Sequence, residues 1–240
     1  MSMLNIKSEA ELRLDLIRIC RMMSLKNYVA ATDGNVTIRM GDRILATPSG
    51  VNKGFLEADQ LLVTDLDGQL VSGVGRPTTE IRIHLLVYQM RPDVQAVVHA
   101  HAPLATAFSI ADIPLPADLL PEVIMTLGAI PTTDYATPAS DEGPEVIRPW
   151  VPSCDAMILK RHGTLTLGRD VYEAYCRLEK VEHLAAVALA THSLGRSPRL
   201  SKTQVRRLAQ IGVESGYISP AAAQLACAGV KKSAGKPKNG

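Results

Sequence analysis

The chain has 240 residues, of which 46% are hydrophobic and 21% charged, and its formal net charge is +2. This is the composition of a globular protein with its own core, and so small an excess of positive charge argues against a nucleic-acid binder. No apolar stretch approaches the length of about 20 residues that a membrane span needs. The first residues lack the apolar region of a secretory signal and the four cysteines form no C-x-x-C pair, so we expect reduced thiols and a cytoplasmic protein.

The predicted elements alternate between helices and strands along most of the chain. A helix is predicted where apolar side chains recur at three- and four-residue steps, and a strand where they alternate with polar ones or form a short apolar run. In chain order these patterns predict a helix over 8–28, hairpins over 36–46 and 61–71, a helix over 77–90, a strand over 96–99, helices over 103–110 and 143–151, strands over 157–159 and 164–167, and helices over 170–194, 201–215 and 219–228.

This order of elements predicts an α/β fold. Hairpins favour a mixed or antiparallel central sheet, and helices before, between and after the strands favour a three-layer sandwich with helices on both faces. Residues 1–228 contain no obvious linker or repeat, so we expect one domain. Residues 229–240 hold four lysines, no acid and little that packs, which predicts a disordered tail.

The pair His99 and His101 is the sharpest chemical feature of the sequence. Residues two apart on a strand point to the same face, so the two imidazoles are candidate metal ligands, although such pairs also occur as ordinary hydrogen-bonded histidines. His162, in the turn between two apolar strands, and Glu80, in the first turn of the predicted 77–90 helix, are further candidates. Three imidazoles and one carboxylate fill a tetrahedral zinc shell, but spacing alone does not bring these four residues together.

Five short motifs follow one another along residues 10–195. They are Asp33-Gly34-Asn35-Val36-Thr37, Thr47-Pro48-Ser49-Gly50, Pro77-Thr78-Thr79-Glu80, Val97-Val98-His99-Ala100-His101 and Arg161-His162-Gly163. The series resembles the class II aldolase/adducin family. The resemblance implies that Glu80, His99, His101 and His162 bind Zn²⁺, or another divalent metal such as Mn²⁺ or Co²⁺. It also implies a homotetramer with active sites at the subunit interfaces.

The same resemblance implies a pocket for a substrate phosphate. Its residues are Gly34, Asn35, Ser49, Gly50, Thr78 and Thr79. The two threonines open a predicted helix, where free N–H groups and the helix dipole favour an anion, and the two glycines let backbone amides approach it. N-capping by the threonines and plain turn chemistry at the other positions are the alternatives.

The activity that the resemblance implies is aldol cleavage. A ketose 1-phosphate, such as L-fuculose 1-phosphate or a 5-deoxypentulose 1-phosphate, would be split through a metal-stabilised enediolate into dihydroxyacetone phosphate and an aldehyde, with Glu80 also acting as the base. A sugar-phosphate dehydratase, decarboxylase or epimerase of the same fold is the alternative. A non-catalytic adducin-like module is a third hypothesis, against which the four intact candidate ligands argue.

One segment departs from the pattern of the family's aldolases. They use a tyrosine after the metal pair for protonation from a neighbouring subunit, whereas residues 116–123 contain none. The nearest ionisable groups are Asp118 and Glu122. Glu122 is a candidate catalytic residue because dehydratases of the family place a glutamate in a similar segment, but a solvated carboxylate near the start of a strand is an equal alternative. Tyr135 and Tyr217 are further candidate proton donors.

Overall fold

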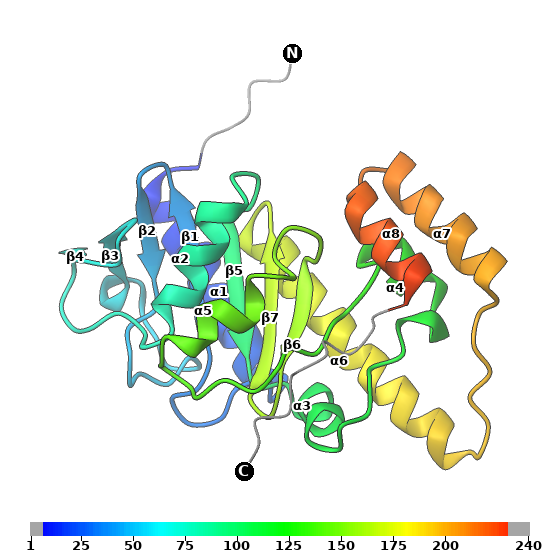
Figure 1. Cartoon of the computed structure of the whole chain (residues 1–240). Coiled ribbons are helices and arrows are strands. Elements are labelled where there is room, and N and C mark those ends of the chain that lie inside the picture. The colour runs from blue at the N-terminus through cyan, green and yellow to red at the C-terminus, as the bar shows by residue number, and fades with distance from the viewer. Residues whose placement is uncertain (1–6, 230–240) are drawn as a thin grey trace, which may run out of the picture.

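The computed structural model describes residues 7–229, and within them an antiparallel sheet of seven strands runs through the molecule (Figure 1). Every pair of neighbouring strands is antiparallel. In spatial order the strands are β4 (Leu70–Ser72), β3 (Leu62–Asp65), β2 (Arg43–Ala46), β1 (Asn35–Met40), β5 (Ala96–Ala100), β7 (Gly163–Gly168) and β6 (Ala156–Leu159).

Helices cover both faces of this sheet. On one face lie α1 (Glu9–Leu25) and α6 (Val171–Ser193), with α3 (Pro103–Ile110) packed against α6, and on the other lie α2 (Ile81–Met90) and α5 (Glu142–Ile147) (Figure 1). Strand β5 contributes to both cores, because Val98 packs on the α1 and α6 side and Val97 on the α2 and α5 side. The predicted three-layer α/β fold is therefore confirmed.

A small helical cluster lies beside the sandwich. Helices α7 (Lys202–Glu214) and α8 (Pro220–Ala228) pack on α4 (Pro121–Thr126) around buried Ile124 and Val205 (Figure 1). The sequence pattern did not predict α4, since six residues are too few to show a helical period. The 3-10 turns Ala58–Gln60 and Ala117–Leu119 are the remaining helical elements of the described residues.

Capping fixes where the long helices begin. Ser8 and Glu11 form a capping box at α1, Ser201 and Gln204 form another at α7, and Asp170 caps α6. Helix α2 begins later than predicted, at Ile81. Thr78 Oγ1 accepts a hydrogen bond from the Glu80 amide, which holds residues 78–80 in a turn, so Glu80 immediately precedes the helix and is not in its first turn. Helix α5 ends at Ile147, four residues before the predicted end.

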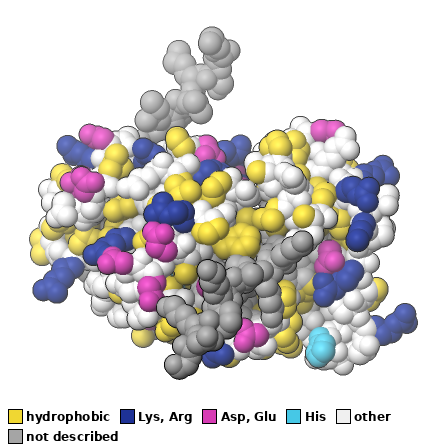
Figure 2. Space-filling model, in the orientation of Figure 1, with side chains coloured by type: hydrophobic (Ala, Val, Ile, Leu, Met, Phe, Trp, Pro, Cys, Tyr) yellow, Lys and Arg dark blue, Asp and Glu magenta, His cyan; other side chains and the backbone are white. Residues whose placement is uncertain are grey.

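The surface carries mixed charge. Figure 2 shows basic and acidic side chains interspersed over one face, in keeping with the small net charge. None of the helices among residues 7–229 combines the length and apolar character needed to cross a membrane. The tail predicted for 229–240 lies outside the described residues apart from Gly229, and a single domain over 1–228 stays a prediction.

Candidate metal centre and substrate pocket

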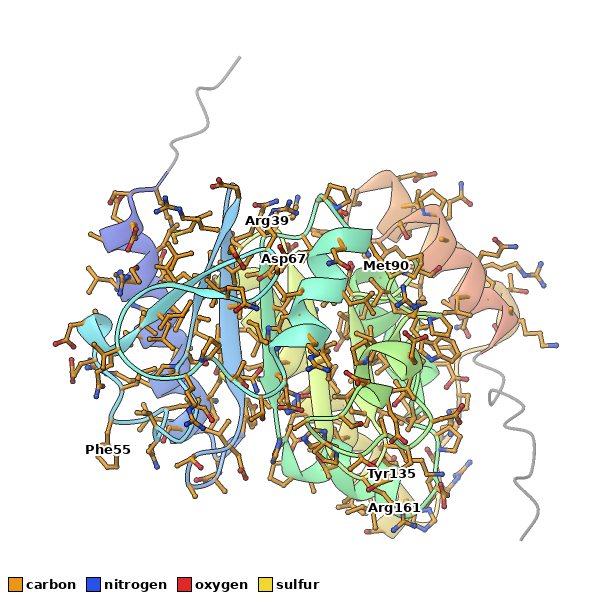
Figure 3. All side chains as sticks on the ribbon, turned by 60° about the vertical axis from the view of Figure 1, so that its left-hand side comes forward. Arg39, Phe55, Asp67, Met90, Tyr135 and Arg161 are labelled. Carbon is orange, nitrogen blue, oxygen red and sulfur yellow. The ribbon has the colours of Figure 1, made fainter. Side chains whose placement is uncertain are left out.

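The candidate metal ligands meet at one end of the sheet. His99 lies one residue before the end of strand β5, and His101 directly follows that strand. The β6–β7 turn provides His162 and the turn before α2 provides Glu80. Figure 3 shows Arg161, the neighbour of His162, at the end of the sheet away from Arg39, which lies near the β1–β2 turn. A Cβ at position 163 would collide with the carbonyl oxygen of Ala100, so only glycine lets this turn approach β5 so closely.

The distances within this cluster are short. Nε2 of His99 lies 3.2 Å from Oε2 of Glu80 and 3.1 Å from Nε2 of His101. Nε2 of His162 lies 3.4 Å from Oε1 of Glu80. The ligand atoms of the three histidines all lie within 4.8 Å of one another. The fold therefore brings together the four residues that sequence spacing left apart.

This donor set fits a divalent metal such as zinc. Zinc binds imidazole nitrogen at about 2.0–2.1 Å in a tetrahedron, which places ligand atoms about 3.3 Å apart. The contacts of 3.1, 3.2 and 3.4 Å match that spacing. Oε1 of Glu80 is buried and has no hydrogen-bond partner among the described residues, so a metal would satisfy an otherwise orphaned atom.

Neighbouring groups orient the imidazoles. Nδ1 of His99 donates to the carbonyl oxygen of Thr164 at 2.8 Å, which leaves a lone pair on Nε2 for a metal. Nδ1 of His101 lies 3.2 Å from Oδ2 of Asp33, an arrangement of carboxylate and imidazole common behind metal sites. Neither Thr164 nor Asp33 was predicted in this role, although Asp33 stands in a motif that the sequence analysis quoted.

The surroundings of His99, His162 and Glu80 favour the protonation states in which these side chains bind a metal. It lowers the pKa of His99 to about 4 and lowers that of His162, so both rings are neutral at pH 7. Burial opposes ionisation of Glu80, but His99, His162 and the amide of Asn35 outweigh it and hold the pKa of the carboxyl below its usual value. His99, His162 and Glu80 are thus held as two neutral imidazoles and a carboxylate, the forms that bind a metal.

A cavity of about 380 Å³ opens onto this cluster. Such a volume lies within the range of small-ligand sites. Its lining includes Glu80, His101 and His162, together with all six residues predicted to hold a phosphate: Gly34, Asn35, Ser49, Gly50, Thr78 and Thr79. The cavity therefore joins the candidate metal ligands to the candidate phosphate residues.

The structure shows the local surroundings of four of the predicted phosphate contacts. Thr78 and Thr79 do not open a helix, because α2 begins at Ile81, so the dipole argument applied to them was wrong. Asn35 donates its amide to Oε2 of Glu80 at 2.9 Å and so holds that carboxylate. Gly34 has a φ of 72°, which other residues adopt with strain, and an added Cβ would collide with Cγ1 of Val29 and lie close to the carbonyl oxygen of His99.

Glu122 does not join the cluster within one chain. It lies in the first turn of α4, not near the start of a strand, and its electrostatic partner is Lys180 of α6. Tyr217 lines a separate small cavity that also includes Lys180. Asp118 pairs with Arg199, and Tyr135 is exposed. None of these four candidate donors lines the 380 Å³ cavity.

Two buried residues near the site were not predicted. His84 of α2 is fully buried, its Nδ1 lies 2.8 Å from Oγ1 of Thr37, and burial lowers its pKa to about 3. Its position four residues after Glu80 would by itself indicate only an ordinary helix-face contact. Lys53 is also buried and lines the cavity. No sequence signal marks it, because its burial depends on turns distant in the chain.

Comparison with known proteins decides the family. The model of the class II aldolase and adducin N-terminal domain matches residues 14–189. The chain belongs to the class II aldolase and adducin family. The resemblance seen in the five motifs is confirmed.

Relatives of more than one activity are similar to this family member. An L-fuculose phosphate aldolase of Methanococcus maripaludis is 37% identical over 180 residues, which cover 75% of this chain and 97% of the relative. A 3-oxo-tetronate 4-phosphate decarboxylase of Haemophilus influenzae is 29% identical over 203 residues, which cover 82% of this chain and 95% of the relative.

The similar solved structures also carry the names of more than one activity. YgbL of Klebsiella pneumoniae, described as a candidate aldolase, epimerase or decarboxylase, matches with a TM-score of 0.79 at 28% identity, covering 84% of this chain and 99% of YgbL. A structure of L-fuculose 1-phosphate aldolase matches with a TM-score of 0.77 at 25% identity, covering 83% of this chain and 95% of that one. The family is thus shown, its relatives include aldolases and a decarboxylase, and the three histidines of this chain are arranged as a divalent-metal site would require.

Proposed function

We propose that this chain is a zinc-dependent aldolase that cleaves a ketose 1-phosphate of the L-fuculose 1-phosphate or 5-deoxypentulose 1-phosphate type. The products are dihydroxyacetone phosphate and an aldehyde. The observation that carries the proposal is the shared cavity, in which three candidate metal ligands and six candidate phosphate-binding residues face one space. The similarity to an L-fuculose phosphate aldolase over 75% of the chain supports it.

The proposed metal ligands are Glu80, His99, His101 and His162. Bound there, zinc supplies a Lewis acid that stabilises the negative charge developing on substrate oxygens when the carbon–carbon bond breaks. Mn²⁺ or Co²⁺ suits the same donors. Asn35 holds Glu80 by one oxygen, which keeps the carboxylate directed at His99 and His162.

Glu80 is the proposed base. It accepts the proton of the hydroxyl on the aldehyde-forming carbon, the adjacent carbon–carbon bond breaks, and the electron pair stays with the dihydroxyacetone phosphate half. A proton delivered to that half completes the reaction. Glu122 is the proposed donor. Because it lies away from the cavity of its own chain, it would act from a neighbouring copy in the proposed homotetramer.

The phosphate of the substrate is proposed to lie between the turns that carry Gly34, Asn35, Ser49, Gly50, Thr78 and Thr79. Small residues dominate these turns, so the turns themselves offer backbone amides and hydroxyl groups as donors. In this proposal the phosphate occupies one side of the cavity and the reacting carbons lie beside Glu80.

Decarboxylation of a phosphorylated 3-oxo acid is the second candidate. The similarity to a 3-oxo-tetronate 4-phosphate decarboxylase and to YgbL favours it. The same metal residues and phosphate pocket would serve, because both reactions break a carbon–carbon bond and leave negative charge next to a carbonyl group.

Parallel product assays distinguish the candidates. The zinc-loaded protein is incubated with a panel of ketose 1-phosphates, and dihydroxyacetone phosphate is measured by coupled NADH oxidation. A second panel of 3-oxo-acid 4-phosphates is assayed for CO₂. Release of dihydroxyacetone phosphate supports the aldolase, and release of CO₂ alone supports the decarboxylase. Zinc binding without either product would favour a non-catalytic module.

A further inference from the structure

Lys53 is a buried lysine at the edge of the proposed phosphate pocket. Its side chain is among the largest fully buried ones, with 1% exposure for the residue, and it lines the 380 Å³ cavity. Its Nζ donates to the carbonyl oxygen of Thr32 at 2.9 Å and to that of Val51 at 2.7 Å. A lysine ammonium has three N–H donors, so one remains for another acceptor.

The two carbonyls belong to the two glycine turns of the pocket. Thr32 lies two residues before Gly34, and Val51 directly follows Gly50. One ammonium therefore ties both turns together. Gly34 and Gly50 both have positive φ, so each turn depends on a backbone conformation that a nearby hydrogen bond can hold in place.

The charge of Lys53 has no close counter-ion. Within residues 7–229, no carboxylate oxygen lies within 4.0 Å of its Nζ. Burial lowers the pKa of Lys53, and the opposing effects of Cys20 and Asp33 offset this only in part. A buried, uncompensated ammonium is costly, and an anionic ligand in the adjoining cavity would supply the missing negative charge.

We propose that Lys53 is a positioning residue of the pocket and supplies its positive charge. It holds the Gly34 and Gly50 turns at the separation that a phosphate group requires, and its ammonium makes the pocket select an anionic ester over the uncharged sugar. This inference rests on the proposed sugar-phosphate function and adds the residue that confers preference for the phosphate.

Calorimetry of inorganic phosphate binding to the full chain, in the absence of zinc, tests the proposal. Lys53→Met removes the charge and both hydrogen bonds at similar length, whereas Lys53→Gln removes the charge and keeps an amide N–H donor on a side chain one atom shorter. Lys26→Met is the matched control, because Lys26 is exposed and pairs with Glu179 away from the cavity. We expect phosphate affinity to fall about tenfold or more in both Lys53 variants and to stay at the parent value in the control.

A second readout separates positioning from general damage. Zinc affinity and circular dichroism should match the parent in Lys53→Gln, since the metal residues are untouched, and this variant decides the question if Lys53→Met does not fold. Parent-like phosphate affinity in the folded Lys53→Gln variant would overturn the inference about Lys53 while leaving the lyase proposal in place. Failure of the parent chain to bind phosphate would overturn both the pocket and the role of Lys53.

Discussion

Oδ2 of Asp33 lies 3.2 Å from Nδ1 of His101, while Nε2 of the same ring faces His99. Asp33 thus orients the imidazole and raises its basicity as a ligand. We predict that Asp33→Asn weakens zinc affinity by about 10- to 100-fold, as is typical when such an outer partner is lost. Competition with a chromogenic chelator measures this. Asp42→Asn, in the exposed β1–β2 turn, is the control. Equal zinc affinity in Asp33→Asn and the parent would contradict the prediction.

His101→Ala tests the ligand assignment. Loss of His101 should remove most of the bound metal and all turnover, because the site loses one of its three imidazole ligands together with the Asp33 contact that orients it. Metal analysis after gel filtration gives the stoichiometry. His192→Ala, on the exposed last turn of α6, should keep the parent's zinc. Stoichiometric zinc in His101→Ala would rule His101 out as a ligand.

Glu80→Gln separates chemistry from folding. The amide occupies the same space beside Asn35, so the fold should persist and zinc should stay on the three histidines with lower affinity. Turnover should fall by about 100-fold or more, the usual contribution of a general base. Steady-state kinetics at saturating zinc measure this, and near-normal rates would exclude Glu80 as the base.

Acid should destabilise the metal-free protein. Burial lowers the pKa of His99 to about 4 and that of His84 to about 3, from a usual 6.5. Between each lowered pKa and 6.5, the unfolded state binds more protons than the folded state. In that pH range the free energy of unfolding therefore rises with pH, and it falls on acidification below pH 6.5. Each buried imidazole contributes roughly 1 kcal/mol per pH unit near pH 5.5.

Urea unfolding of chelator-treated protein at several pH values measures this slope. His84→Gln should flatten it, whereas His192→Gln should leave it unchanged, since His192 is exposed. A slope in His84→Gln as steep as in the parent would show that His84 is not held neutral in the folded state.

Local patterns account for much of the fold. Sequence patterns predicted the helices with capping residues, because a cap lies within a few residues of the helix start. They also predicted the two hairpins, whose turns are at Gly41-Asp42 and Asp67-Gly68. Helix α4 was missed because it is too short to show a period. The start of α2 was misplaced because Thr78 stabilises a turn before it, a side-chain contact that periodicity does not reveal.

The site depends on contacts between distant segments. The shared face of His99 and His101 follows from strand geometry, but His162 reaches them only because β5 pairs with β7, which aligns Ala100 with Thr164. The family resemblance predicted that outcome; spacing did not. Asp33 and Lys53 acquire their partners only when three separate turns meet, so no local pattern could have predicted them.

Zinc titration of the metal-stripped protein tests the central claim most directly. Dihydroxyacetone phosphate release from the best ketose 1-phosphate is followed as zinc is added in fractions of an equivalent. We expect no release without metal, a linear rise as zinc is added, and a plateau at one zinc per chain. Full release from the metal-free protein, or a rate that does not respond to zinc, would contradict that claim.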